Sequence, residues 1–340
     1  MSAIAPDVGC SVDLDETAST ILAVQRADGA IPWYRGGRLD PWNHVEAAMA
    51  LTVSGEIDAA RRAFEWLDVH QLENGSWFAA YAEDGSVLEV HTDTNATAYL
   101  ATGLHLYHLA TGDESFTRSM FATVDRALDF VVRFVDDRGM LPWSIGPGGT
   151  RSKDSLFAAS ASVVMSLRCG VALAFALGEQ RERWLRAARA IAESVAVRES
   201  TFLDKSVFAM DWYYPVLCGV LEPDRACRRL EGSLERFFDP AHGVRCRADG
   251  AWVTSAESAE CAVAFARAGM DARARRILAV AQGLRAGDGA YRTGVVPPRC
   301  SEYPRDERTT YSAAAMILAA DVLSGGPSTQ IFSPLTGSAA

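Results

Sequence analysis

The stretch TSAESAECAVAF, Thr254–Phe265, predicts the start of a helix that carries two carboxylates on one face. Thr254 is a favoured N-cap residue, and Glu257 three positions later completes the pattern of a capping box, in which each side chain bonds the backbone amide of the other residue. Glu260 follows three residues further on, so Glu257 and Glu260 share one stripe of a helix that is otherwise small and apolar. Helix capping by Glu257 and exposure of Glu260 to solvent explain these charges as well as a functional site does. The same kind of helix opening must therefore be sought elsewhere in the chain.

Helices of two characters alternate along the chain. Charged, amphipathic segments such as Ser115–Val135 alternate with small, apolar segments such as the one that opens at Asp40, where Asp is a good cap and Pro41 suits the first helical position. The pattern gives six pairs with a period of about 50 residues. The twelve expected helices are Glu16–Arg26, one from Asp40, Glu56–Gln71, one from His91, Ser115–Val135, one from Asp154, Gln180–Val197, one from Asp211, Pro223–Phe238, one from Thr254, Asp271–Gln282 and one from Asp306.

The second helix of every pair is uniformly small and apolar, which fits an inner helix that is covered on all sides. We therefore predict an all-α fold, an (α/α)6 barrel or toroid of six helix pairs, rather than an open solenoid, which would need capping repeats. The alternation excludes a sheet. Because no linker interrupts the series, residues 1–340 are expected to form a single domain, with 1–13 and 326–340 as flexible tails. Every inner helix should start at the same end of the ring.

Composition narrows the class of protein. The chain has 340 residues, 49% of them hydrophobic, and a net charge of -10, which argues against binding to nucleic acid or to an anionic membrane. No secretory signal is visible, and no apolar run approaches the roughly 20 residues that span a bilayer. Seven scattered cysteines without CxxC spacing suggest free thiols in a reducing cytoplasm. His105 and His108 are helically spaced but fit packing better than metal binding, so we expect no metal and no cofactor.

Polar residues gather at the predicted openings of the inner helices, where they would face one funnel. Alignment of the small-residue runs gives two levels. The outer level holds Asn43, Thr94, Asp211, Glu257 and Thr309. The level one turn deeper holds Glu46, Thr97, Tyr214, Glu260 and Ser312. The polar residues expected to line the funnel are Asp40, His44, Glu46, Asp93, Asn95, Asp211, Glu257, Glu260 and Arg308.

Aromatic residues crowd the same region, and aromatic faces beside carboxylates and amides are typical of sugar-binding sites. Trp33 and Trp77 belong to repeated turns and are interpreted as structural wedges, whereas Trp42 and Trp212 lie beside acids and favour contact with a ligand. The full aromatic set is Trp33, Tyr34, Trp42, Trp77, Trp143, Trp212, Tyr213, Tyr214 and Trp252.

Glycoside hydrolysis needs one carboxylic acid to protonate the leaving oxygen and a second carboxylate to activate water or attack carbon. We predict Glu257 as the general acid, because a wall of Ala and Cys would raise its pKa. Asp40, at a loop-helix junction, is predicted as the base, with Asp93 and Asp211 as substitutes. Capping alone also explains Asp40 and Asp93, and a pairing with Lys205 or an arginine would explain Asp211.

Three turns carry a family resemblance. QRADGAIPW (25–33), QLENGSWF (71–78) and AQGLRAGDGAY (281–291) resemble the turns of terpenoid cyclase and protein prenyltransferase toroids, and the six helix pairs resemble the (α/α)6 barrel of many glycoside hydrolases. The catalytic signatures of the prenyl enzymes are missing, since the DxDD-like DLDE at 13–16 precedes the first helix and the acids at 136–137 lack DDxxD spacing. No Cys and His pair for zinc stands at an inner-helix start.

A narrower resemblance rests on DPWNHVEAAM (40–49), DWYYPVLCG (211–219) and TSAESAEC (254–261), which are similar to the methylmannose polysaccharide hydrolase family. The resemblance implies a cytoplasmic endo-α-mannosidase that cuts an intracellular polysaccharide of 3-O-methylmannose, and fold analogy implies inversion. The expected partner is an oligo- or polysaccharide, and a homo-oligomer stays an open alternative. A terpenoid or prenyl enzyme and a non-catalytic glycan-binding toroid are the other hypotheses. The loops at 144–153 and 294–305 are long enough for rims or lids but could equally be passive connections.

Overall fold

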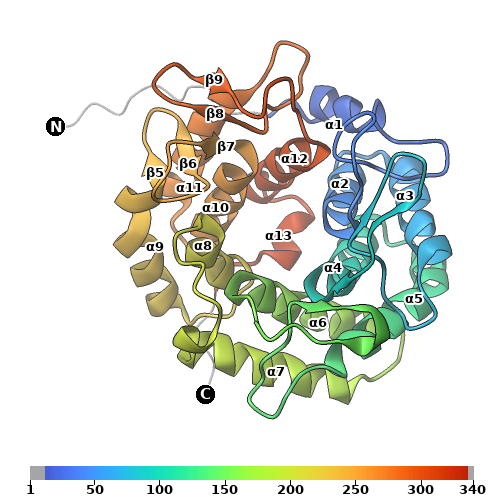
Figure 1. The fold of residues 1–340 in the computed structure, drawn as a ribbon. Coiled ribbons are helices and arrows are strands. Elements are labelled where there is room, and N and C mark those ends of the chain that lie inside the picture. The colour runs from blue at the N-terminus through green and yellow to red at the C-terminus, as the bar shows by residue number, and fades with distance from the viewer. Residues whose placement is uncertain (1–11, 336–340) are drawn as a thin grey trace.

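Six inner helices form a closed ring in the computed structural model, which describes residues 12–335 (Figure 1). Each inner helix packs against the next one, and the last packs back against the first, so the ring has no open edge. The predicted all-α toroid is therefore confirmed. The inner helices are α2 (Pro41–Val53), α4 (Thr94–Thr111), α6 (Phe157–Ala176), α8 (Ala209–Leu217), α10 (Ser255–Arg267) and α12 (Thr310–Ser324).

The outer helices surround this ring and bury one face each. In α9, for example, Ala226 and Leu230 are buried one turn apart, while Arg228 between them is exposed. This is the amphipathic pattern that the sequence predicts for the outer layer. The outer helices are α1 (Leu14–Leu22), α3 (Ile57–His70), α5 (Glu114–Val132), α7 (Glu182–Val197), α9 (Pro223–Phe237) and α11 (Asp271–Ala281).

Two repeated turns are each held by a glutamine and a glycine in equivalent positions. The side-chain amide of Gln25 donates to Gly29 O within its own turn and to Ala59 O on the next outer helix, and Gln71 repeats this with Gly75 O and Thr123 O. Gly29 has φ +93°, and a Cβ there would lie 2.1 Å from Arg62 O, so only glycine fits. These turns are structural links between neighbouring repeats.

Short strands lie in the loops at the end of the ring where the inner helices begin, so the expectation that the alternation excludes a sheet is wrong. β3 (Thr92–Asp93) pairs antiparallel with β4 (Ser144–Ile145) and leads directly into α4. A five-stranded antiparallel sheet, in the order β5-β6-β7-β8-β9, includes the strand that leads into α10. The remaining strands are β1 (Ala80–Tyr81), β2 (Val87–Glu89), β5 (Phe238–Asp239), β6 (Gly243–Arg245), β7 (Val253–Thr254), β8 (Gly294–Val296) and β9 (Ser301–Glu302).

These strands shift several helix starts from their expected positions. The fourth helix begins at Thr94 rather than at His91, because residues 92–93 are extended and paired with β4. The sixth begins at Phe157 rather than at Asp154, and the last at Thr310 rather than at Asp306. Polar residues before an apolar run predict a helix opening to within a few residues, but the pairing and path of the preceding loop fix the exact residue.

The far end of the ring is closed by the short helix α13 (Ser328–Ile331), which packs on α12 and α4 and lies at the centre of the ring in Figure 1. Ile331 and Phe332 are buried. Residues 328–332 therefore differ from the flexible tail expected from 326, because their apolar side chains plug the ring. The outer parts of the expected tails, residues 1–11 and 336–340, lie outside the described residues.

One helix, α6, is long and apolar enough to cross a membrane by length and composition, which corrects the expectation that no apolar run reaches about 20 residues. In its most apolar 18-residue window, 78% of the residues are buried inside the molecule. An inner helix with neighbours on all sides needs no polar face. The composition of α6 therefore follows from its place in the ring.

The inner helices approach so closely that some positions admit no side chain. A Cβ on Gly103 of α4 would lie 2.5 Å from Val45 Cγ1 on α2 and 3.1 Å from Phe64 on α3. We predict that Gly103→Ala destabilises the protein by roughly 1–3 kcal/mol through overpacking. On α9, a Cβ at Gly232 would meet nothing within 4 Å, and Gly232→Ala should stabilise by about 0.5–1 kcal/mol. Urea unfolding checks both, and equal stabilities for the two variants would contradict the packing argument.

Candidate active site

A central cavity of about 950 Å³ opens where the inner helices begin, and all six of these helices contribute residues to its wall. Carboxylates at the openings of four inner helices line it: Asp40, Asp93, Asp211 and Glu257. The structure thus brings the two predicted catalytic residues and both predicted substitutes to one cavity.

Asp40 is the N-cap of α2, as its position before Pro41 predicts. Its Oδ1 accepts from the amide of Asn43 at 2.9 Å, and its Oδ2 accepts from the indole N–H of Trp33. Burial raises the pKa of Asp40, while the bonds from Asn43 and Trp33 oppose that rise. Asp40 therefore combines capping with a place at the cavity wall.

Asp93 is the N-cap of α4, and its Oδ1 accepts from the amides of Asn95 and Ala96 at 2.8 and 2.9 Å. Burial raises its pKa to about 6, and the charge of nearby Asp40 adds to the rise, while the two amides oppose it. A carboxyl group with this pKa changes its protonation state close to neutral pH, as acid-base chemistry requires.

Asp211 lies in the first turn of α8 and its carboxylate reaches across to the neighbouring inner helix. Its Oδ1 accepts from the amide of Ala158 at 3.3 Å, and α6 has no side-chain cap of its own at Leu156. Burial raises the pKa of Asp211 to about 6, opposed by the Ala158 amide and by the charge of Arg229. An arginine was one predicted partner, and Arg229 also donates to the backbone oxygen of Asp211 at 2.7 Å.

Glu257 lies in the first turn of α10. The expected capping box is not formed: the hydroxyl of Thr254 donates to Glu257 Oε2 instead of accepting from the helix. The thiol beside Glu257 is that of Cys246, whose pKa is raised by burial and further by the charge of Glu257. Glu257 lines the central cavity and makes no cap bond, so its carboxyl group is placed to meet a ligand there.

Aromatic side chains form much of the rest of the wall. Trp42 is stacked on Tyr99 with ring centroids 4.2 Å apart, so its orientation in the cavity is fixed from below. Trp33 also lines the cavity, which corrects its interpretation as a wedge, whereas Trp77 is buried and donates to Leu67 O as a wedge would. The aromatic residues at the wall are Trp33, Trp42, Trp143, Phe208, Tyr214, Trp252, Tyr303 and Tyr311.

Two predicted binding residues, His44 and Trp212, lie outside the cavity. His44 is fully buried between layers, where it accepts from Ile31 N and contacts Ala63 O, and burial lowers its pKa to about 4. Trp212 points outward, with its indole N–H donating to the backbone oxygen of Arg229. These two predictions are wrong because adjacent residues on a helix point in directions about 100° apart.

Arg308 does not line the cavity either, since its guanidinium pairs with Asp288 and Glu302. Of the other expected aromatic residues, Tyr34 and Tyr213 are also absent from the wall. Thr94 does not line the cavity, because its hydroxyl donates to Pro142 O. Asn95, Trp42 and Tyr214, in contrast, line the cavity as predicted.

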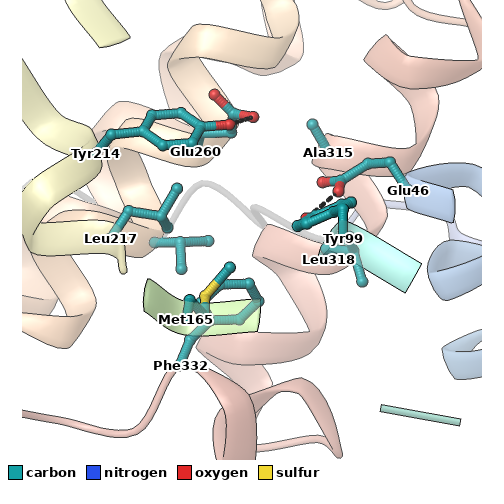
Figure 2. A pocket seen from close by; sticks show the side chains of 10 residues that line it. Glu46, Tyr99, Met165, Tyr214, Leu217, Glu260, Ala315, Leu318 and Phe332 are labelled. Carbon is teal, nitrogen blue, oxygen red and sulfur yellow. Dashed lines mark hydrogen bonds between the residues drawn. The ribbon is translucent and has the colours of Figure 1, made fainter. Parts of the chain in front are cut away.

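Glu46 and Glu260 lie one turn deeper than the cavity wall, around a separate inner cavity of about 20 Å³ (Figure 2). The prediction that they line the funnel is wrong. The hydroxyl of Tyr99 donates to Glu46, and those of Tyr213, Tyr214 and Tyr311 donate to Glu260. The small volume admits a single water molecule, not a sugar.

Burial raises the pKa of Glu46 to about 7, opposed by the Tyr99 hydrogen bond. Burial also raises the pKa of Glu260 to about 8, the charge of Glu46 adds to the rise, and the bonds from Tyr213 and Tyr311 oppose it. Both carboxyl groups are thus strongly perturbed without standing in the open cavity.

Sequence reasoning missed several residues of the wall. Glu89 and His91 alternate with Asp93 along one extended segment, and period-two alternation could have found them once a strand was recognised. Tyr311 directly precedes the aligned Ser312. Arg38 and Lys205 come from loops that carry no such signal, and Arg38 is paired with Glu89 at 2.7 Å. The wall therefore carries basic groups beside its carboxylates.

The two acidic motifs that were compared with those of prenyl enzymes, at 13–16 and 136–137, have structural roles. Asp13 in DLDE caps α1, accepting from the amide of Glu16 at 2.9 Å. Asp136 closes a turn by accepting from Arg138 and Met140. Neither residue lines the central cavity.

Comparison with solved structures supports the architecture. A wild-type glycosidase aligns with a TM-score of 0.73 at 18% identity, covering 95% of this chain and 99% of the other. The GH63 mannosylglycerate hydrolase from Thermus thermophilus aligns with a TM-score of 0.68 at 14% identity over 89% of this chain and 99% of the other. D-mannose isomerase shares the same fold, with a TM-score of 0.73 at 10% identity over 94% of this chain and 99% of the other. No family model matches the sequence.

The toroid, together with a cavity lined by carboxylates and indole rings, defines an (α/α)6 glycoside hydrolase. The sequence is 40% identical over 309 residues to the MMP endo-(1,4)-3-O-methyl-alpha-D-mannosidase of Mycolicibacterium hassiacum, and the match covers 91% of this chain and 85% of the relative. The chain belongs to the family of that enzyme. The terpenoid and prenyl hypothesis is therefore set aside.

The two inner carboxyl groups make stability depend on pH. Glu46 and Glu260 have folded-state pKa values of about 7 and about 8, above the ordinary 4.5, so the folded protein binds more protons than the unfolded chain between these values. The stabilisation of the folded state by these two groups is complete below pH 4.5 and is lost as the pH rises through 7 and 8. The free energy of unfolding should fall by a few kcal/mol between pH 5.5 and pH 9, because a tenfold change in one proton-binding constant corresponds to about 1.4 kcal/mol.

Urea unfolding of Glu46→Gln at both pH values checks this, because the amide keeps an oxygen for Tyr99 but cannot ionise. The variant should lose less stability than the wild type at pH 9. Glu231→Gln, at an exposed position of α9, is the matched control and should follow the wild type. Identical pH dependence in wild type and Glu46→Gln would show that Glu46 does not carry the effect.

Proposed function

We propose that this protein hydrolyses internal α-(1→4) bonds of a 3-O-methylated mannose polysaccharide in the cytoplasm. The observation that carries the proposal is the placement of Asp40 on α2 and Glu257 on α10 at one aromatic-lined cavity. The name of the 40% identical relative supports the linkage, the methylated sugar and the internal site of cleavage. The six described cysteines are free, which suits a reducing compartment.

The lining of the cavity suits a methylated sugar. Four indole rings offer flat apolar faces for sugar rings, and the carboxylates and amides at the helix starts can accept or donate to free hydroxyls. An O-methyl group adds apolar area and removes a donor, so it favours an aromatic wall over a fully polar one. A cavity of about 950 Å³ has room for several hexose units.

In the proposed mechanism Glu257 is the general acid that protonates the leaving glycosidic oxygen, and Asp40 is the base that takes a proton from water. Glu257 lines the cavity, where its carboxyl group can meet the leaving group. Asp93, next to Asp40 at the wall and with a pKa of about 6, is the substitute for the base, and Asp211 is the second substitute. Asn95, Trp42 and Tyr214 are proposed to contact the substrate.

We predict inversion, by analogy with other hydrolases of this fold. An inverting enzyme holds water between its base and the sugar, so the β-anomer should form first from an α-linked substrate. Proton NMR during the first minutes of hydrolysis distinguishes the anomers. Initial accumulation of the α-anomer would instead require a nucleophilic carboxylate and a retained configuration.

The substrate class is tested with a panel of α-mannans, α-glucans and their 3-O-methylated forms, read by mass spectrometry. We expect new reducing ends and mid-sized fragments from 3-O-methylated α-(1→4)-mannan, with slower or no cleavage of the glucans. Single sugar units released from one end would contradict internal cleavage. Binding without any change in the oligosaccharides would favour a non-catalytic glycan-binding toroid.

The catalytic roles are tested with Glu257→Gln and Asp40→Asn on the best substrate of that panel. Each change keeps size and a hydrogen-bonding oxygen but removes the titratable group, and Asn retains the N-cap preference of Asp. We expect kcat to fall by about 10²- to 10⁴-fold with the melting temperature little changed. Glu231→Gln on the surface should match the wild type. Wild-type kcat in Asp40→Asn would move the role of base to Asp93.

A further inference from the structure

Glu260 makes an unusual set of contacts for a buried carboxylate. It is 6% exposed and accepts hydrogen bonds from three tyrosine hydroxyls and, among the described residues, from no cationic side chain. Tyr214 donates to its Oε1 at 3.0 Å and Tyr311 donates to the same oxygen, while Tyr213 donates to Oε2. Figure 2 shows Tyr214 and Glu260 on one side of the inner cavity, with Glu46 and Tyr99 on the other.

Two of the three tyrosines also belong to the wall of the central cavity. Tyr214 on α8 and Tyr311 on α12 line it, although Glu260 itself does not. One carboxylate on α10 therefore ties together aromatic residues from the two helices that flank it. These two helices are far apart in the sequence, so no local interaction could set the spacing of these two rings.

Glu260 also lies directly beneath the proposed acid. Glu257 and Glu260 are three residues apart on α10 and share one face of that helix. Tyr311, whose hydroxyl donates to Glu260, lines the central cavity together with Glu257. Tyr214 and Tyr311, both bound by Glu260, thus line the cavity next to the predicted site of bond cleavage.

We propose that Glu260 is a positioning residue for glycoside hydrolysis, which holds the hydroxyls of Tyr214 and Tyr311 so that their rings seat the sugar next to Glu257. The inference rests on the proposed function, and it assigns to Glu260 a role through the tyrosines rather than a contact with substrate. A sugar seated out of line with the acid still binds through the rest of the cavity but reacts slowly, since small misplacements at the reacting atoms cost large factors in rate.

The test measures kcat, KM and melting temperature for Glu260→Gln, Tyr311→Phe and the double variant, on the substrate that the wild type cleaves best. An amide nitrogen cannot accept, so Glu260→Gln loses the acceptor for at least one of the three tyrosine hydroxyls. We expect kcat to fall about 10- to 100-fold in each single variant with KM changed less than about threefold. Because the two residues act as one unit, the double variant should lose far less than the product of the single losses.

Tyr107→Phe is the matched control. Tyr107 is fully buried and donates to Asp113 at 3.1 Å, so it is another phenol-carboxylate pair, but neither residue lines the central cavity. It should lose stability and keep the wild-type kcat. Glu260→Leu removes every acceptor and should lower kcat further. If Glu260→Leu does not fold, Glu260→Gln tests the inference by itself.

Wild-type kcat in Glu260→Gln and Tyr311→Phe, or losses that multiply in the double variant, would overturn the inference while leaving the hydrolase itself intact. Equal losses of stability and no change in kcat would show that the cluster is structural only. A wild type that cleaves nothing in the mannan and glucan panel overturns the proposed function instead, so the two failures are distinguishable.

Discussion

Closure of six inner helices into one ring, all beginning at the same end, is the constraint on which the rest of the molecule depends. Every inner helix has neighbours on both sides and an outer helix behind it, so most of its positions must be small and apolar. Gly103 shows how little space is left, because even one methyl group would overlap with Val45 on the next inner helix. Within residues 12–335, α13 plugs the other end of the ring, and the end with the helix starts is open.

That open end concentrates unpaired backbone amides, and the first turn of each helix favours negative charge. Asp40 and Asp93 satisfy these amides as N-caps, and Asp211 does so for a neighbouring helix. The same geometry gathers carboxylates around one cavity and buries them, which raises the pKa of each. The same carboxylate can therefore cap a helix and line a cavity suited to acid-base chemistry.

Depth in the ring divides the acidic residues into two groups with different environments. Glu257 reaches the open cavity, whereas Glu260 one turn below is enclosed by tyrosine hydroxyls. Glu46 occupies the same deep level on α2 and shares its inner cavity with Glu260. Carboxyl groups with raised pKa values are often candidates for catalysis, but here the enclosed pair, with pKa values of about 7 and about 8, exceeds Asp93 and Asp211 at about 6. The shape of the cavities, and not the pKa, therefore distinguishes the carboxyl groups that are open to a ligand.

The sequence alone determined the alternation of helix types, the closed toroid and the helix opening at Asp40, because periodicity and capping are local properties of the chain. It could not determine the short strands, since residues 92–93 pair with residues 144–145, which lie far along the chain. Nor could it tell that His44 and Trp212 point away from the cavity while their neighbours point in, because a step of about 100° per residue makes the direction depend on how each helix is rotated in the ring. Tertiary structure alone decided that rotation, since it is set by packing against several neighbouring helices at once.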